Sequence, residues 1–243
     1  FLIDMWKIGV DEAGRGPVIG PLVVCAVALP IDQYDLLKSV GVKDSKFLTK
    51  KKRKELIEWF YQNSKTKSWH YKLIICPPER IDSSSNQQGL NVLETELFAE
   101  AINGLPEEVK QSVEILNDAC DVKPKRFTDR IANQIKSWPW ENSTMTSEHK
   151  ADENDPFVGI ASILAKEKRD ECIEEISEIL GFSVGSGYPS DPNTKKILPK
   201  LLENEPHPQL RWSWATVERE WKNLHDKELP KRNKPPKSQS TLF

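Results

Sequence analysis

Acidic residues placed where predicted strands end and predicted helices begin are the side chains best suited to chemistry. Asp11 and Glu12 are adjacent at the end of a predicted strand, and Asp118 closes another. Asp152 comes just before the longest predicted helix. Such positions on one edge of an α/β sheet are where these folds bind ligands. We therefore expect the four carboxylates to meet at one site.

Electrostatics limits what converging carboxylates can do. Two like charges about 4 Å apart repel by roughly 4 kcal/mol at an effective dielectric near 20, so the group needs a cation. Oxygen ligands without His or Cys favour Mg²⁺ or Mn²⁺, which keep waters and bridge to substrate phosphates. Two such ions support phosphodiester cleavage or transfer. A lone Asp more often caps a helix or turn, and we interpret Asp121 and Asp155 in that way.

A glycine-rich turn follows the first acidic pair, in the sequence DEAGRGPVIGPL over residues 11–22. Neighbouring side chains of a strand point to opposite faces, so Asp11 and Glu12 can serve one site only where the strand twists or ends. Gly14 and Gly16 make such an ending feasible and let the backbone approach a ligand closely.

Hydrophobic spacing predicts the elements that position these residues. Strands are expected over residues 6–11, 22–29, 69–76 and 113–116, and the first two form a hairpin. Helices are expected over residues 49–62, 91–102, 124–135, 156–180, 193–203 and 214–225. This order describes an α/β domain with a mixed sheet and an all-α appendage at its C-terminal end.

Composition excludes several classes of protein. The 37% of hydrophobic residues fall in periodic runs, which excludes disorder over the full length of 243 residues. The longest apolar stretch, residues 18–30, is interrupted by Gly20 and Pro21, so no membrane span is expected. The first residues contain Asp4 and no basic segment, which disfavours a secretory signal, and we expect a cytoplasmic protein. Four scattered cysteines without a CxxC pair predict neither a disulfide nor a zinc site.

Two segments are basic although 35 Lys and Arg against 37 Asp and Glu leave a net charge of −2. They lie over residues 43–54 and 231–237. They could contact phosphates, or they could be ordinary solvated surfaces, which is the commoner case.

Several motifs, in order along the chain, resemble the type 2 ribonuclease H family and its archaeal branch in particular. They are DEAGRGPVIGPL, KDSKFLT, LNDACD, HKAD, ASILAKEKRD and GSGYPSDP. The resemblance implies an α/β, ribonuclease H-like fold in a single-chain monomer: a five-stranded mixed sheet with flanking helices, plus a helical C-terminal extension. We expect a catalytic domain over residues 1–192, the extension packed on it over 193–230, and a basic flexible tail over 231–243.

The resemblance also implies an activity. Asp11, Glu12, Asp118 and Asp152 would hold two ions, Mg²⁺ or Mn²⁺, at the scissile phosphate. The enzyme would cut the RNA strand of RNA–DNA hybrids and the 5′ side of single ribonucleotides in duplex DNA, leaving a 5′-phosphate and a 3′-hydroxyl. The alternative is a non-catalytic hybrid-binding or sliding-clamp adaptor protein on the same fold, which the presence of all four acids disfavours.

Recognition of the ribose is implied at the glycine turn. Gly14, Arg15 and Gly16 would contact the 2′-hydroxyl largely through backbone groups, and Tyr188 would hold the turn and stack on the next sugar. The 2′-hydroxyl is both donor and acceptor and distinguishes RNA from DNA at a site. A purely structural role for Tyr188, as an anchor of its loop, is the alternative.

Phosphate contacts are implied for Lys46, Ser162 and Lys166, which would position the substrate without reading its sequence. For Lys166 an ordinary salt bridge on the helix surface is nearly as good an explanation. The segment RWSWAT resembles the family's arginine and tryptophan stretch, and we interpret Trp212 there as part of a packed aromatic lid.

The last residues, QSTLF, resemble the start of a sliding-clamp-binding motif through Gln239, Leu242 and Phe243. A disordered tail that docks one short hydrophobic plug suits such recruitment. A sliding clamp is therefore an expected partner beside the nucleic acid.

Overall fold

The computed structural model describes residues 5–42, 48–85 and 88–232. The predictions for Lys46 and for Gln239, Leu242 and Phe243 lie outside the described residues. Within the described ranges, every helix is too short or too polar to span a bilayer.

A five-stranded sheet forms the centre of the fold, with the strand order β3-β2-β1-β4-β5. Its strands are β1 (Trp6–Ala13), β2 (Leu22–Pro30), β3 (His70–Cys76), β4 (Val113–Asp118) and β5 (Ser143–Glu148). β1 pairs antiparallel with β2 and parallel with β4, which confirms the predicted hairpin and the mixed sheet. β5 pairs parallel with β4 and completes the five strands that the resemblance implies, but the hydrophobic pattern gave no range for it, because its residues STMTSE are polar.

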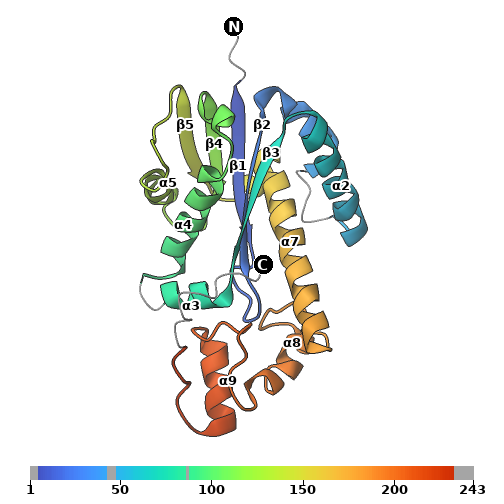
Figure 1. Ribbon diagram of the computed structural model, residues 1–243, viewed down its shortest axis with the longest axis vertical. Coiled ribbons are helices and arrows are strands. Elements are labelled where there is room, and N and C mark those ends of the chain that lie inside the picture. Colours follow the sequence, from blue (N-terminus) through green and yellow to red (C-terminus); the bar gives the residue numbers. More distant parts are fainter. Residues whose placement is uncertain (1–4, 43–47, 86–87, 233–243) are drawn as a thin grey trace.

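Helices cover both faces of the sheet (Figure 1). On one face lie α4 (Leu90–Asn103) and α5 (Pro124–Ala132), and on the other α2 (Lys50–Thr66) and α7 (Pro156–Leu180). Residues Leu22 to Leu29 of β2 are buried on both sides, as expected of a strand between two layers. Each layer has its own apolar cluster, one with Phe98 and Phe127 and the other with Phe60 and Phe157.

The N-terminal end of α7 is fixed tightly against β1. Asp155 caps the helix by accepting from the backbone N–H of Phe157 at 2.9 Å, which confirms its predicted capping role, and it pairs with Lys7 at 2.6 Å. A Cβ at Gly9 would lie 2.3 Å from the backbone of Phe157, so only glycine permits this approach. Because β1 carries Asp11, this packing fixes the position of α7 relative to the acidic pair.

The shorter helices differ more from the sequence predictions. α1 (Tyr34–Ser39), α3 (Pro78–Ser85) and α6 (Ala151–Asn154) were not predicted, whereas α9 (Ala215–His225) was. The helix expected over residues 124–135 ends at Ala132. The helix expected over 193–203 is wrong in its second half: α8 (Pro192–Ile197) stops, and a 3₁₀ turn follows at Lys200–Leu202, because Pro199 cannot continue an α-helix.

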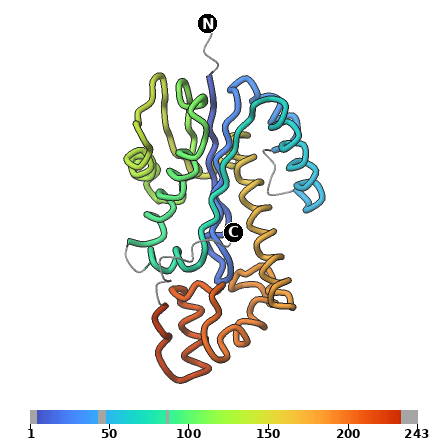
Figure 2. Tube along the Cα trace, viewed as in Figure 1, coloured from blue at the N-terminus to red at the C-terminus, as the bar shows by residue number. Residues whose placement is uncertain are grey.

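The C-terminal extension packs against the loop between β1 and β2. Figure 2 shows this orange to red part of the trace gathered beyond one end of the sheet. Val18 and Ile19 of the loop are buried in one apolar cluster with Leu210 and Trp221, and Ile19 forms an isolated β-bridge with Leu210. The loop that follows the acidic pair is thus held by residues nearly 200 positions later in the chain.

Candidate active site

Three acidic side chains converge where β1 and β4 end. The two strands are parallel neighbours, so Asp11 and Glu12 on β1 come close to Asp118 at the end of β4. One carboxylate oxygen from each residue lies within 4.8 Å of the others. Asp152 on α6 lines the same pocket. The structure therefore brings all four predicted acids to one pocket.

Backbone N–H groups orient two of these carboxylates, those of Asp11 and Asp118, by hydrogen bonds. The backbone N–H of Glu12 donates to Asp11 Oδ1 at 2.7 Å, and the N–H of Ala151 donates to Asp118 Oδ1 at 2.6 Å. On α7, Lys166 Nζ donates to Ser162 Oγ at 2.7 Å and lies 3.9 Å from Asp152.

Lys166 and Ser162 differ in how far they are open to the pocket. Lys166 lines the pocket and is partly exposed, so the ion pair with Asp152 and access to a ligand coexist. Ser162 is fully buried behind the acidic pair. Its hydroxyl is a hydrogen-bond partner of Asp11 as well as of Lys166.

The acidic pair is electrostatically unfavourable in the absence of a cation. Burial, followed by the charges of Glu12 and Asp118, raises the pKa of Asp11 well above its usual range. Burial and then the charge of Glu94 raise the pKa of Glu12 to about 8. Glu12 Oε2 is buried and has no hydrogen-bond partner within the described part of the chain. A cluster of oxygen donors with an unpaired buried oxygen fits a hard divalent cation.

These pKa values predict how the stability of the metal-free protein depends on pH. Glu12 has a raised pKa in the folded state and one near 4.3 when unfolded, so the folded chain binds more protons between these values. The free energy of unfolding should therefore fall as pH rises from about 4.3 to 8. Glu12→Gln removes the charge, and we expect it to exceed wild type in stability by at least about 1 kcal/mol at pH 8.

Urea unfolding in EDTA at several pH values measures this difference. Glu58→Gln, at an exposed position on α2, is the control and should follow the wild-type profile. A Glu12→Gln variant no more stable than wild type at pH 8 would contradict the assignment of an uncompensated buried charge to Glu12.

The turn that follows the acidic pair is held by its backbone carbonyls. Gly14 has a φ of 91°, and a Cβ there would lie 2.8 Å from the carbonyl oxygen of Pro21, so glycine is required. The carbonyls of Gly14 and Arg15 both accept from the guanidinium of Arg211, at 2.6 and 3.0 Å. The indole N–H of Trp214 donates to the carbonyl of Gly16 at 3.4 Å. The C-terminal extension thereby contacts all three residues of the turn.

Arg211 is the residue of this site whose role the sequence did not indicate. It is completely buried, and it also donates to the carbonyls of Gly20 at 3.0 Å and Pro21 at 2.9 Å. Burial, followed by the charge of Arg169, lowers its pKa to about 10, so it remains charged at neutral pH. One guanidinium thus fixes both ends of the loop from Gly14 to Pro21.

The segment that carries Arg211 is itself anchored. Asp82 on α3 accepts from the backbone N–H groups of Trp212 and Ser213 at 3.0 and 2.9 Å. The indole N–H of Trp212 donates to the carbonyl of His207, and the guanidinium of Arg232 lies 4.6 Å from its ring centroid. These contacts agree with the interpretation of Trp212 as a packed aromatic residue.

Tyr188 lies beside the Gly14–Gly16 turn. The residue is 37% exposed, and a Cβ at Gly16 would lie 3.5 Å from its ring. The guanidinium of Arg169 stacks 5.0 Å from the ring centroid and also donates to the carbonyl of Ser186 in the same loop. The contact with Arg169 anchors Tyr188, and the exposed part of the ring faces the groove described next.

A groove extends from the acidic pocket past the turn. It shares Glu12 and Lys166 with that pocket, and its lining also includes Arg15, Gly16, Arg53, Arg169 and Tyr188. Its cations come from the loop after β1, from α2 and from α7, so the groove suits a phosphate backbone that passes the carboxylates.

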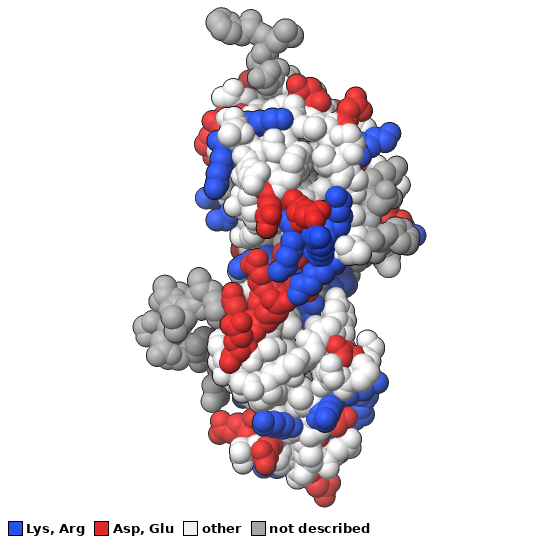
Figure 3. Space-filling view, turned by 90° about the vertical axis from the view of Figure 1, so that its right-hand side faces the viewer, with Lys and Arg blue, Asp and Glu red and all other residues white. Residues whose placement is uncertain are grey.

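The basic start of α2 is partly neutralised by α7. Lys50 pairs with Glu174 at 2.5 Å, and Arg53 lies 3.3 Å from Asp170 and 3.8 Å from Glu167. Figure 3 shows blue and red side chains next to one another across the middle of this face. Part of the basic segment 43–54 therefore pairs within the chain, while Arg53 also lines the groove.

The fold and the site define a class of protein. A five-stranded mixed sheet with carboxylates at the ends of its neighbouring strands β1 and β4 is the arrangement of a ribonuclease H-like nuclease. The chain belongs to the ribonuclease HII family, whose model matches residues 8–217. The predicted family and fold class are thus confirmed, and the chain is an endoribonuclease that acts on RNA–DNA hybrids.

Relatives and solved structures agree with this assignment. The chain is 39% identical to a ribonuclease HII of Methanococcus maripaludis, over 91% of this chain and 90% of the relative. It is 43% identical to that of Pyrococcus furiosus, over 86% and 88%. The structure of ribonuclease H2 from Pyrococcus horikoshii OT3 superposes with a TM-score of 0.80 at 36% identity, over 92% of this chain and 100% of that one.

Proposed function

We propose that this chain is a divalent-metal-dependent endonuclease that cuts the RNA strand of RNA–DNA hybrids and also the 5′ side of single ribonucleotides embedded in duplex DNA. The observation that carries the proposal is the approach of Asp11, Glu12 and Asp118 to within 4.8 Å beside the Gly14–Gly16 turn. The expected products are a 5′-phosphate and a 3′-hydroxyl.

The four acids of the pocket, Asp11, Glu12, Asp118 and Asp152, would hold the metal. The oxygen-only donor set and the unpaired buried oxygen of Glu12 favour Mg²⁺ or Mn²⁺. Two bound ions would supply an activated water and stabilise the leaving oxygen. Lys166, at the edge of the pocket, would contact a phosphate oxygen, while Ser162 orients Asp11 and Lys166.

The ribose would be recognised at the turn. Arg211 and Trp214 hold the carbonyls of Gly14, Arg15 and Gly16, which fixes the peptide planes against which a 2′-hydroxyl would lie. Tyr188 offers a partly exposed ring for stacking on the neighbouring sugar. Backbone groups in fixed positions can donate to and accept from a 2′-hydroxyl, the group that RNA has and DNA lacks.

A labelled DNA duplex that carries one ribonucleotide tests the proposal. With Mg²⁺, the wild-type chain should cut once, on the 5′ side of the ribonucleotide, and EDTA should stop the reaction. An all-DNA duplex of the same sequence is the control and should remain intact. Cleavage in EDTA would contradict the metal requirement, and cleavage of hybrids without cleavage of this duplex would contradict the single-ribonucleotide activity.

A sliding clamp is the protein partner that we propose. Support comes from a ribonuclease HII of Archaeoglobus fulgidus, 35% identical, whose structure was solved as a complex with PCNA and superposes with a TM-score of 0.73, over 86% of this chain and 95% of that one. The residues QSTLF at the end of this chain would supply the plug through Gln239, Leu242 and Phe243.

Deletion of residues 233–243 should separate recruitment from catalysis. We expect co-elution with a PCNA-type clamp to be lost, whereas cleavage of a short oligonucleotide stays within about twofold at high salt, where contacts of the removed lysines are screened. Leu242→Ala with Phe243→Ala retains those lysines and should lose the clamp alone. Clamp binding that survives both changes would contradict a role for the tail.

A further inference from the structure

The side chain of Arg15 points away from the Gly14–Gly16 backbone and reaches α4, which packs on one face of the sheet. Its Nη1 donates to Glu94 Oε2 at 2.6 Å, and its Nη2 donates to Asn91 Oδ1 at 2.6 Å. Nη1 also lies 3.3 Å from the carbonyl of Cys120, in the loop after Asp118. The Arg15 side chain is 37% exposed and that of Glu94 is completely buried, so a buried acceptor holds a half-exposed guanidinium.

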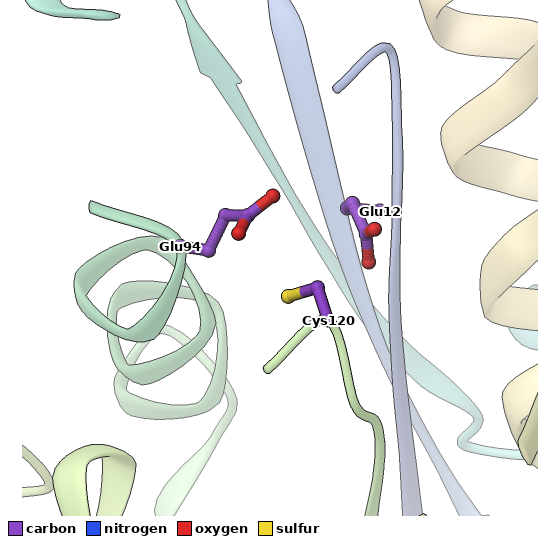
Figure 4. A group of neighbouring side chains, drawn as sticks. All are labelled: Glu12, Glu94 and Cys120. Carbon is purple, nitrogen blue, oxygen red and sulfur yellow. The ribbon is translucent and has the colours of Figure 1, made fainter. Parts of the chain in front are cut away.

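Glu94 occupies an unusual position for a carboxylate. Figure 4 shows Glu94 pointing from α4 toward Glu12, with Cys120 between them. Its carboxylate is also a hydrogen-bond partner of the Cys120 thiol, and its second oxygen, Oε1, has no nitrogen or oxygen donor among the described residues. These three side chains could together hold a cation, but the guanidinium 2.6 Å from Glu94 Oε2 already supplies a positive charge. The geometry is therefore that of an anchor for Arg15.

Asn91 and Glu94, which anchor Arg15, hold a fixed position relative to the acidic pair. α4 packs against β1 and β2, the strands on either side of the turn, so Asn91 and Glu94 are fixed with respect to Asp11 and Glu12. Arg211, in the C-terminal extension, donates to backbone carbonyls of the turn. Residues of α4 hold the side chain of Arg15 in the same turn. The half-exposed guanidinium lines the groove beside Tyr188.

We propose that Glu94 and Asn91 are positioning residues for ribose discrimination, because they set the conformation of the Gly14–Gly16 turn through Arg15. This inference rests on the proposed function of the turn. Neither Asn91 nor Glu94 is among the described residues that line the groove or the acidic pocket, so both would act through Arg15. Their loss should weaken the preference for RNA over DNA and leave the general affinity for duplex phosphates in place.

Binding without turnover measures this preference directly. In EDTA, the affinity for an RNA–DNA hybrid and for a DNA duplex of the same sequence is compared by fluorescence anisotropy. In Glu94→Ala the ratio of the two affinities should fall by about fivefold, the worth of a hydrogen bond of roughly 1 kcal/mol, while the DNA affinity stays within about twofold. Asn91→Ala, at a partly buried position, should lower the ratio in the same direction.

Conservative and control variants separate positioning from folding. Glu94→Gln keeps an oxygen acceptor for Arg15 and should restore most of the ratio. Glu100→Gln, on the same helix and hydrogen-bonded to Arg80 at 3.0 Å, lies away from the turn and should match wild type. Melting temperatures identify a variant that fails to fold, and Asn91→Ala and Glu94→Gln then still decide the matter.

Three results would overturn the proposal. An unchanged ratio in Glu94→Ala and Asn91→Ala would show that the turn does not need this anchor. Equal losses of affinity for hybrid and for DNA would indicate a structural role only. A wild-type chain that binds both duplexes equally would contradict the proposed function of the turn, and this inference would fall with it.

Discussion

Asp11→Asn and Asp118→Asn should each lower the turnover of an RNA–DNA hybrid by at least about a hundredfold, since loss of even an outer-shell partner of a metal ligand costs 10–100-fold. Asn keeps the shape of the side chain but removes the charge that a divalent cation needs. Binding should remain within about threefold of wild type, because duplex affinity comes mainly from phosphate contacts with basic residues elsewhere in the groove.

Single-turnover cleavage and anisotropy binding measure the two effects separately. Asp129→Asn, an exposed residue of α5 paired with Lys125, is the matched control and should retain full turnover. Mg²⁺-dependent cleavage at the wild-type rate in either variant would remove that residue from the site. Loss of binding together with turnover would mean that the acids contribute to folding or to substrate contact.

Arg211→Met should cause the largest loss of stability among single substitutions at this site. It removes donors from four backbone carbonyls, those of Gly14, Arg15, Gly20 and Pro21. A buried acceptor left unpaired costs about 1–3 kcal/mol, so we expect a loss of at least about 3 kcal/mol. For a chain of this length that corresponds to a fall of roughly 6–12 °C in Tm.

Thermal unfolding of two further variants tests the explanation. Arg211→Lys keeps the charge but cannot reproduce the planar arrangement of donors, so its Tm should lie between those of wild type and Arg211→Met. Arg219→Met, at an exposed position on α9, should change Tm little. If Arg211→Lys is as stable as wild type, a positive charge at position 211 would be sufficient for stability. The hydrogen bonds to four carbonyls would then contribute little.

The sequence predicts the acidic site better than its supports. Asp11 and Asp118 were predictable because each ends a strand with a strong apolar pattern, and parallel strands bring their ends together. The resemblance implied a fifth strand, but the range of β5 was not predictable from hydrophobic spacing, since its polar residues at the edge of the sheet resemble those of a loop. The site therefore follows from hydrophobic periodicity, while the sheet edge beside it depends on pairing with β4.

The second group of residues escaped prediction for a different reason. Arg211 donates hydrogen bonds to backbone carbonyls. Every residue has such a carbonyl, so the residue types of a sequence do not indicate which ones Arg211 contacts. In the sequence, Glu94 resembles any charged residue on a helix, yet it is completely buried and pairs with Arg15, 79 residues earlier in the chain. Only the three-dimensional arrangement reveals contacts of this kind.

The hydrogen bonds between Arg211 and the glycine turn also order events during synthesis of the protein. Gly14 and Arg211 are 197 residues apart, so the turn leaves the ribosome long before its partner exists. At a synthesis rate of about 5–20 residues per second, roughly ten seconds or more pass between the synthesis of Gly14 and that of Arg211, which fixes the loop after the acidic pair. A nascent chain, or one truncated before Arg211, would carry the carboxylates without the hydrogen bonds that fix the Gly14–Gly16 turn. The proposed recognition of the ribose thus becomes possible only after Arg211 has been made.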